Sequence, residues 1–157
     1  MNVKELVINY EEYGCAEELS PDDRQLLDSA LEAIGGAYAP YSHFKVGAAV
    51  RLDDGTVVRG ANQENAAYPS GLCAERTAMF AAAAQYPGRK LVALAVICEQ
   101  DGMLLDSPGA PCGACRQVMA QYERECGRPM RIILGSRRIV RVFTGVASLM
   151  PFIFDNL

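Results

Sequence analysis

The chain has 157 residues, 50% of them hydrophobic, and carries a formal net charge of −4 with an isoelectric point near 5.0. This length is typical of one domain that buries about 70% of its unfolded surface, so the fold is not expected to depend on disulfides. The acidic balance disfavours general attraction to a phosphate backbone, and the longest apolar stretch, residues 91–98, falls far short of the roughly 20 residues that span a bilayer. We therefore expect neither a nucleic-acid partner nor a membrane partner.

The first twenty residues contain five glutamates and no apolar core behind a basic start, which argues against a secretory signal peptide. We expect a cytoplasmic, reducing location in which the six cysteines stay free. Residues 1–20 are interpreted as an N-terminal extension, and residues 21–157 as a single domain.

An amphipathic helix is predicted to open this domain. Ser20 is a suitable N-cap, Pro21 suits the first helical position, and two aspartates follow near the positive end of the helix dipole. Apolar residues then recur at helical spacing as far as Ile34, and a Gly-Gly pair ends the helix.

A β-hairpin and a second helix are predicted next. Residues 44–52 and 56–60 are two strand-like runs joined by a short turn at residues 53–55. Residues 72–85 are rich in alanine and stop before a Pro-Gly pair, so they predict a helix.

The second half of the chain predicts three more strands and one helix. Residues 91–98 form a continuous apolar run, typical of a strand buried on both faces. Residues 112–126 predict a helix, and residues 130–134 and 139–143 predict two strands around a Gly-Ser turn. This order of elements predicts an α/β protein with a five-stranded mixed sheet and helices on its faces.

Three cysteines and one glutamate stand in two short segments, residues 73–75 (Cys-Ala-Glu) and 111–115 (Pro-Cys-Gly-Ala-Cys). Three protein ligands would leave a tetrahedral zinc with one open position for water, as a catalytic site requires. Cys73 and Cys112 fall at the predicted starts of two helices, where free backbone N–H groups and the helix dipole favour thiolate over thiol. The pattern predicts one catalytic zinc ion per subunit, with the ligands Cys73, Cys112 and Cys115.

Two other interpretations of the cysteines remain open. The C-x-x-C pair alone could be a redox pair, but a redox motif does not account for Cys73 and Glu75. A closed structural zinc site would need a fourth ligand, and neither His43 nor the remaining cysteines have a helpful spacing. His43 is expected to be a turn or packing residue, and Cys98 a core thiol.

Six arginines between positions 124 and 141 concentrate positive charge in the C-terminal third, whereas acidic residues dominate the first thirty positions. Solvated faces or subunit contacts would explain them, and an anionic partner is the alternative.

Four segments resemble a known family. Residues 40–49 (PYSHFKVGAA), 60–65 (GANQEN), 73–78 (CAERTA) and 111–117 (PCGACRQ) closely resemble the small zinc-dependent cytidine deaminases, in the same order. Zinc deaminases as a class carry a signature of His or Cys, any residue, Glu, and later Pro-Cys-x-x-Cys. The resemblance covers residues 40–117 and implies a three-layer α/β/α cytidine deaminase-like fold, with the catalytic domain at residues 21–157.

The resemblance also implies a role for individual residues. Glu75 would be the catalytic proton shuttle, and Arg76 would hydrogen-bond the ligand sulfurs and offset their charge. Asn62 and Glu64 would hydrogen-bond a ribose hydroxyl, and Phe44 would pack on the pyrimidine ring.

Three further substrate contacts follow from the resemblance. The backbone N–H of Ala74 would meet the ring carbonyl. The small family members form homotetramers whose active sites include side chains from neighbouring subunits, and Tyr68 and Phe154 match such positions. The alternative is that these two aromatic residues pack within their own subunit.

The expected reaction is hydrolytic deamination of cytidine and deoxycytidine to uridine and deoxyuridine with release of ammonia, in pyrimidine salvage. An amide and a carboxylate suit hydroxyls and would repel a phosphate, which favours a free nucleoside over a nucleotide or polynucleotide. The long segment 99–110 before the metal loop leaves open a cytosine nucleoside antibiotic of the blasticidin S type. A non-catalytic zinc-stabilised binding module and an RNA-editing deaminase are the other hypotheses, disfavoured by Glu75 and by the acidic charge.

Overall fold

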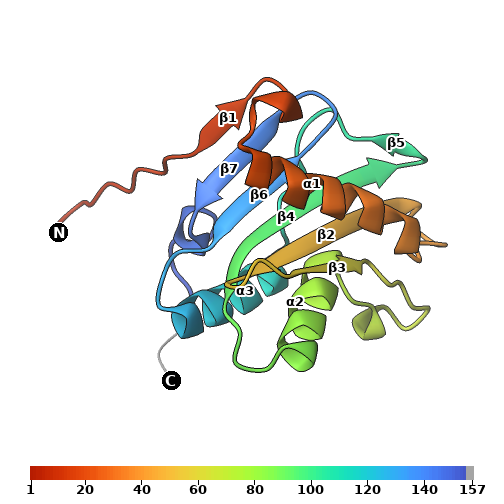
Figure 1. Cartoon of the computed structure of the whole chain (residues 1–157). Helices are drawn as coiled ribbons and strands as arrows, with labels where there is room; N and C mark the ends of the chain where they lie inside the picture. Colours follow the sequence, from red (N-terminus) through yellow and green to blue (C-terminus); the bar gives the residue numbers. More distant parts are fainter. Residues whose placement is uncertain (155–157) are drawn as a thin grey trace.

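In the computed structural model, which describes residues 1–154, a mixed sheet lies between helices (Figure 1). Its strands are β1 (Glu11–Tyr13), β2 (Phe44–Leu52), β3 (Val57–Ala61), β4 (Leu91–Gln100), β5 (Met103–Leu104), β6 (Arg131–Gly135) and β7 (Val140–Thr144). The strand order is β1-β7-β6-β4-β2-β3, and β5 pairs with β4 outside this path. The pairing of β4 with β6 is parallel and the other strand pairs are antiparallel.

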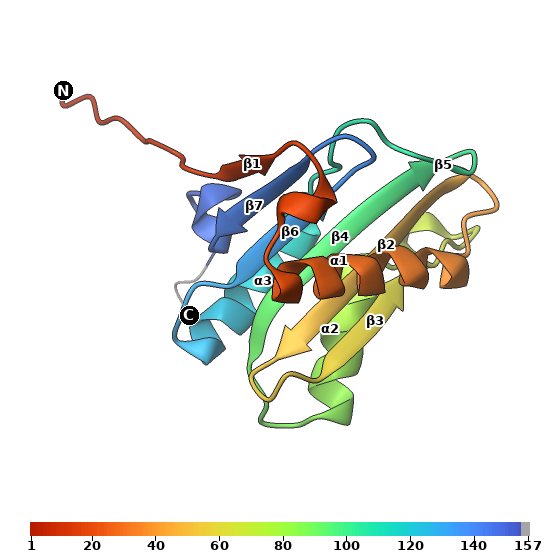
Figure 2. The ribbon, with the colours of Figure 1, turned by 45° about the horizontal axis from the view of Figure 1, so that its top comes forward.

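Helices cover both faces of the sheet. The helices are α1 (Pro21–Ala33), α2 (Ala74–Gln85) and α3 (Gly113–Cys126), with short 3-10 turns η1 (Ala16–Glu18), η2 (Ile34–Gly36), η3 (Tyr68–Ser70) and η4 (Val146–Ser148). Helix α1 lies across one face, and α2 and α3 lie side by side on the other (Figures 1 and 2). The predicted three-layer α/β/α arrangement is therefore confirmed.

Two hydrophobic cores result, one on each face of the sheet. Ala48 and Val50 of β2 pack with residues of α2 and α3, whereas Ala49 between them packs with residues of α1. Successive side chains of a strand point to opposite faces, so a fully apolar strand serves both cores.

Two glycines allow the helices to approach the sheet closely. A Cβ atom on Gly47 of β2 would lie 2.0 Å from the carbonyl oxygen of Ala30 in α1. A Cβ atom on Gly60 of β3 would lie 2.4 Å from the backbone nitrogen of Ala78 in α2. Gly60 therefore sets the position of the helix that begins at the Cys-Ala-Glu segment.

The predicted elements all occur, and the N-cap of α1 is as expected, because the Ser20 hydroxyl accepts a 3.2 Å hydrogen bond from the backbone N–H of Asp23. The predicted number of strands was too low by two. The strand β1 consists of Glu, Glu and Tyr and shows no apolar alternation, and β5 has only two residues. Strand β1 forms because its edge pairs with β7, with Glu12 opposite Arg141.

The arginine-rich C-terminal third pairs with acidic residues of the same chain. These ion pairs link the N-terminal acids and the 99–110 segment to the far end of the sequence, which supports internal pairing over an anionic partner. The pairs are Arg131 with Glu11 and Asp23, Arg141 with Glu12, and Arg137 and Arg138 with Asp106.

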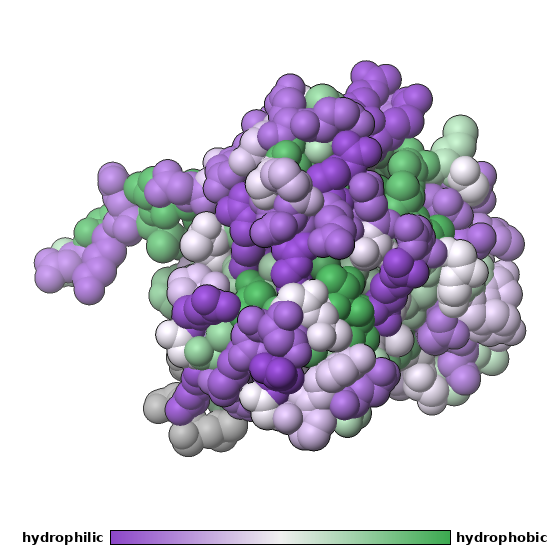
Figure 3. Space-filling view, viewed as in Figure 1, coloured by the Kyte–Doolittle hydropathy of each residue, from purple (hydrophilic) through white to green (hydrophobic). Residues whose placement is uncertain are grey.

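Hydrophilic side chains cover most of the face around α1 in Figure 3. None of the helices within residues 1–154 is long and apolar enough to cross a membrane.

Candidate active site

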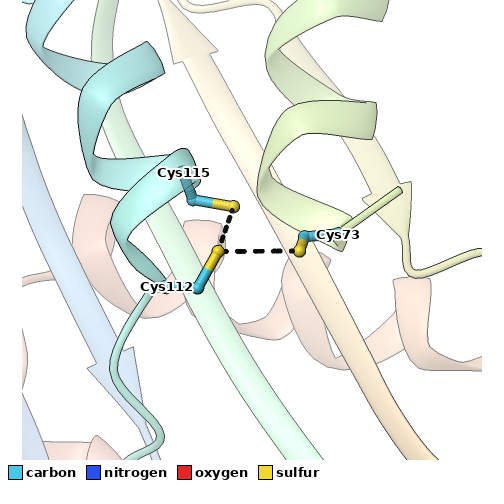
Figure 4. Close-up of side chains that lie close together, drawn as sticks. All are labelled: Cys73, Cys112 and Cys115. Carbon is cyan, nitrogen blue, oxygen red and sulfur yellow. Dashed lines mark hydrogen bonds between the residues drawn. The ribbon is translucent and has the colours of Figure 1, made fainter. Parts of the chain in front are cut away.

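The three predicted ligand thiols lie together at the N-terminal ends of α2 and α3 (Figure 4). The Sγ atom of Cys112 is 3.8 Å from that of Cys73 and 3.5 Å from that of Cys115. Sulfur atoms about 3.8 Å apart are what a tetrahedral zinc with Zn–S bonds of about 2.3 Å requires. Within the described residues 1–154, no fourth histidine, cysteine or carboxylate joins this group.

The fold explains why two segments nearly forty residues apart meet here. Helix α2 precedes β4 and helix α3 follows it, and both pack on the same face of the sheet. Because each runs against β4, both helices begin at the carboxyl end of that strand. Cys73 is the N-cap residue of α2 and Cys112 is the N-cap residue of α3, as predicted.

The charge environment suits a bound cation. The pKa of Cys73 is lowered to about 5, chiefly by a hydrogen bond from the Cys115 thiol and also by Arg76, whose Nη2 lies 3.4 Å from the Cys73 sulfur. The pKa of Cys115 is raised by the same interaction with Cys73 and by burial. One thiolate is thus stabilised by the protein alone, and a second needs a positive charge beside it.

The Arg76 side chain provides an independent sign of a charged centre. Its Nε is buried without a hydrogen-bond partner among the described residues, while its other end faces the thiols. A guanidinium beside three thiolates would offset the net negative charge of a zinc with three thiolate ligands. The residues present therefore fit zinc.

Glu75 is almost completely buried, with 5% of its surface exposed, although it is charged in its usual state. Burial raises the pKa of its carboxyl group, and the nearby Cys73 sulfur contributes in the same direction. A carboxyl group with a raised pKa can both take up and return a proton.

A cavity of about 340 Å³ joins these groups, a volume within the usual range for small-molecule sites. It is bounded by apolar side chains and a few polar ones. Two larger hollows of about 530 and 510 Å³ lie elsewhere and contain none of the predicted site residues. The predicted residues that line the cavity are Phe44, Asn62, Glu64, Cys73, Glu75 and Cys112.

Asn62 and Glu64 are held firmly beside this cavity. The Asn62 amide donates to the Phe44 carbonyl at 2.9 Å and accepts from the Val46 N–H at 2.8 Å. The Glu64 carboxylate accepts from the backbone N–H groups of Tyr41 and Ser42, at 2.9 and 3.3 Å, and from the Ser42 hydroxyl. These bonds, the Ser42 hydroxyl first, lower the pKa of Glu64.

The remaining predicted residues lie at the edge of the site or outside it. Ala74 is buried as the first residue of α2, where backbone N–H groups have no partner within the helix. Tyr68 is 77% exposed and lines an adjoining hollow of about 300 Å³, edge-on to Tyr41. Phe154 is 69% exposed, and its backbone is bonded to the Gln117 side chain of α3. Within one chain, neither aromatic residue lines the cavity of about 340 Å³.

The sequence did not identify several residues that line the cavity. Ser42 belongs to a recognised segment, but its contact with Glu64 joins positions 22 apart. Cys98 is buried, as predicted for a core thiol, and burial raises its pKa to about 12. Gly109 and Ala110 bring the end of the long segment into the cavity wall.

Comparison with known proteins adds an independent line of observation. The model of the cytidine and deoxycytidylate deaminase zinc-binding region matches residues 20–126. A cytidine deaminase of Halalkalibacterium halodurans is 43% identical over 134 residues, which cover 85% of this chain and 94% of that protein.

Solved structures agree with this match. The cytidine deaminase of Burkholderia pseudomallei is similar with a TM-score of 0.68 and 44% identity, over 83% of this chain and 97% of the other. That of Mycobacterium tuberculosis is similar with a TM-score of 0.66 and 37% identity, over 87% and 99% of the two chains.

Proposed function

The chain belongs to the family of zinc-binding cytidine and deoxycytidylate deaminases, and we propose that it catalyses the hydrolytic deamination of cytidine and deoxycytidine. Water replaces the amino group at C4 of the base, so that uridine or deoxyuridine and ammonia are released. One observation carries the proposal above the others: a single cavity is lined by metal-ligating thiols, a buried carboxyl group and a pair of polar side chains suited to a sugar. The relatives are named cytidine deaminases, which favours this substrate over an antibiotic. A non-catalytic binding module would not need the carboxyl group of Glu75 beside the thiols.

We assign the metal to Cys73, Cys112 and Cys115, with Arg76 offsetting part of the thiolate charge. Zinc supplies Lewis acidity that lowers the pKa of water toward neutrality. The N-terminal end of α2 and Arg76 favour the ionised form of Cys73, and the positive charge of the metal would favour ionisation of the other two thiols.

Glu75 moves the protons of the reaction. Its carboxylate takes a proton from the attacking water and delivers it to N3 of the base. A second proton from the same water then passes through Glu75 to the departing amine as the C4–N bond breaks. Burial raises the pKa of this carboxyl group, which favours its taking up a proton from water.

The sugar and the base are recognised by the remaining groups of the cavity. The Glu64 carboxylate accepts a hydrogen bond from a ribose hydroxyl, to which the Asn62 amide also hydrogen-bonds. Phe44 packs on the pyrimidine ring, and the N–H of Ala74 donates to the ring carbonyl. A carboxylate in this position repels a phosphate, which makes the free nucleoside the substrate.

We further propose a cytoplasmic homotetramer that acts in pyrimidine salvage. The exposure of Tyr68 and Phe154 supports a shared site, since both side chains are accessible to a neighbouring subunit. Six cysteines without a disulfide support a reducing compartment.

The proposal is tested by the ultraviolet absorbance of zinc-loaded protein incubated separately with cytidine, deoxycytidine and blasticidin S. We expect loss of the cytosine band with both nucleosides. The Glu75→Gln variant should retain zinc and lose at least about a hundredfold in turnover, because it cannot move a proton. The surface variant Glu32→Gln serves as the matched control.

Loss of the band with the antibiotic alone would replace the substrate assignment. Full turnover by Glu75→Gln would overturn the role of the carboxylate.

A further inference from the structure

The Ser42 hydroxyl lies between two groups to which we assign substrate contacts. It donates a hydrogen bond to Glu64 and accepts one of 3.0 Å from the backbone N–H of Phe44. The Ser42 hydroxyl is therefore used both as a donor and as an acceptor by residues of the cavity wall.

Glu64 depends on this segment for its orientation. The Tyr41 and Ser42 N–H groups reach one carboxylate oxygen, and the Ser42 hydroxyl reaches the other. A carboxylate offers about four acceptor positions, so three donors fix its plane and leave one position for a further donor. A sugar hydroxyl can occupy that position.

The turn that carries Ser42 is itself fixed from the other side. The Gln100 side chain donates to the Ser42 carbonyl at 3.1 Å, and the Asp101 N–H donates to the His43 carbonyl at 3.2 Å. His43 adopts a left-handed backbone conformation with φ of 55°. The β4–β5 hairpin thus braces the turn against Glu64.

Phe44 and Asn62 complete the connection. The Phe44 carbonyl accepts from the Asn62 amide, and the Phe44 N–H donates to Ser42. The base-packing ring and the two sugar-reading side chains are consequently joined through one backbone segment and one hydroxyl.

We propose that Ser42 is a positioning residue that aligns Glu64 for the sugar hydroxyl and couples it to Phe44. The inference rests on the proposed nucleoside deaminase function and concerns the same site. Ser42 does not touch the reacting atoms; it acts through Glu64, so its removal should weaken sugar recognition and spare the chemical step.

The test compares Ser42→Ala with the parent enzyme on cytidine and on 2′,3′-dideoxycytidine, which lacks the hydroxyls that Glu64 could bind. We expect KM for cytidine to rise by about tenfold with little change in kcat, because a hydrogen bond to a charged group is lost. The dideoxy substrate should show no such difference. Ser42→Thr, which keeps the hydroxyl, should restore the parent KM.

A double-mutant cycle tests the coupling between Ser42 and Glu64 with cytidine as the only substrate. In a Glu64→Ala background, Ser42→Ala should add no further loss, because the two residues act as a unit. Ser29→Ala removes a hydroxyl bonded to the Gln25 carbonyl in α1, on the other face of the sheet, and serves as the matched control.

An equal loss on both substrates, or additive losses in the cycle, would overturn the role of Ser42 while the deaminase function stands. A parent enzyme that turns over neither substrate would overturn both proposals.

Discussion

At the residue scale, Arg76 extends from the first turn of α2 to the proposed metal site. Its guanidinium approaches the Cys73 sulfur, and its Nε finds no partner in the surrounding residues of the described chain. An arginine left partly unsatisfied in a protein interior costs stability unless negative charge lies beside it. We therefore infer that the negative charge of the thiolates stabilises Arg76 in this position.

Arg76→Gln is expected to weaken zinc binding by about ten- to a hundredfold, because the charge of the three thiolates loses its offset. Competition with a chromophoric chelator measures this affinity. Arg138→Gln, at an exposed ion pair with Asp106, provides the control and should leave it unchanged. Unaltered affinity in Arg76→Gln would remove Arg76 from the metal site.

The sequence was sufficient to predict the groups closest to the chemistry, because their spacing within two short segments is local information. The three thiols meet as predicted, whereas the roles of Glu75 and the substrate contacts stay predictions. The contacts of Ser42 could not be predicted, because they depend on a turn conformation and on a residue 22 positions away.

At the element scale, the position of α2 depends on the absence of a side chain at Gly60. A methyl group there would lie 2.7 Å from the Ala74 carbonyl oxygen and 2.8 Å from the Ala78 Cα, both backbone atoms that cannot rotate away. The start of α2 carries Cys73 and Glu75, so the packing of β3 bears directly on the site.

Gly60→Ala is expected to lower the free energy of unfolding by about 1–3 kcal/mol and to reduce zinc affinity, because α2 must shift to relieve the overlap. Denaturant titration and zinc competition measure the two effects. Gly35→Ala is the control, since a Cβ atom there would have no neighbour within 4 Å. Equal behaviour of the two variants would show that β3 does not set the position of α2.

Both glutamates of β1 form ion pairs with arginines of β6 and β7, and Tyr13 packs against the hydrophobic core. The pKa of Glu11 is lowered by its hydrogen bond from Tyr13 and by Arg131. A lowered pKa in the folded state means that its stabilising contribution is present above the ordinary pKa of 4.5 and is lost as pH falls through the lowered value.

Replacement of Glu11 and Glu12 by Gln should therefore loosen β1 at neutral pH, and the difference from the parent should disappear in acid. Hydrogen exchange of the β7 amides that face β1 is the measurement, with Glu32→Gln as control. Unchanged protection of these amides would mean that the backbone pairing alone holds β1.

The short strands β1 and β5 are the two that the sequence did not predict. Long apolar or alternating runs predicted the five central strands and all three helices, since burial dictates their pattern. Strand β1 pairs with β7, roughly 130 positions away, and partners so distant in sequence leave no periodic signal near β1.

At the scale of the whole molecule, two exposed aromatic residues bear on the proposed contacts between subunits. Tyr68 and Phe154 are largely exposed in the single chain, and neither lines the cavity of about 340 Å³. The active site shared between subunits that we propose would explain both observations.

Light scattering is expected to give about four times the 17.0 kDa mass of the chain. If Tyr68 serves the cavity of a neighbouring subunit, co-expression of Tyr68→Ala with Glu75→Gln should restore activity that neither variant has alone. Co-expression of Cys73→Ala with Glu75→Gln should restore none, because each substitution inactivates the cavity of the subunit that carries it and no cavity remains intact. A fully active monomer would contradict the shared site.

The positions of the thiols along the chain have a consequence for how the protein folds. Cys112 and Cys115 are close in sequence, but Cys73 lies 39 positions before Cys112 and lies beside it in the folded chain, where α2 and α3 pack on the same face of the sheet. An unfolded chain can therefore capture zinc with two sulfurs, and completion of the site is a loop closure that the native topology must supply. Zinc then binds the folded chain more tightly than the unfolded one, so the melting temperature should rise with the concentration of free zinc.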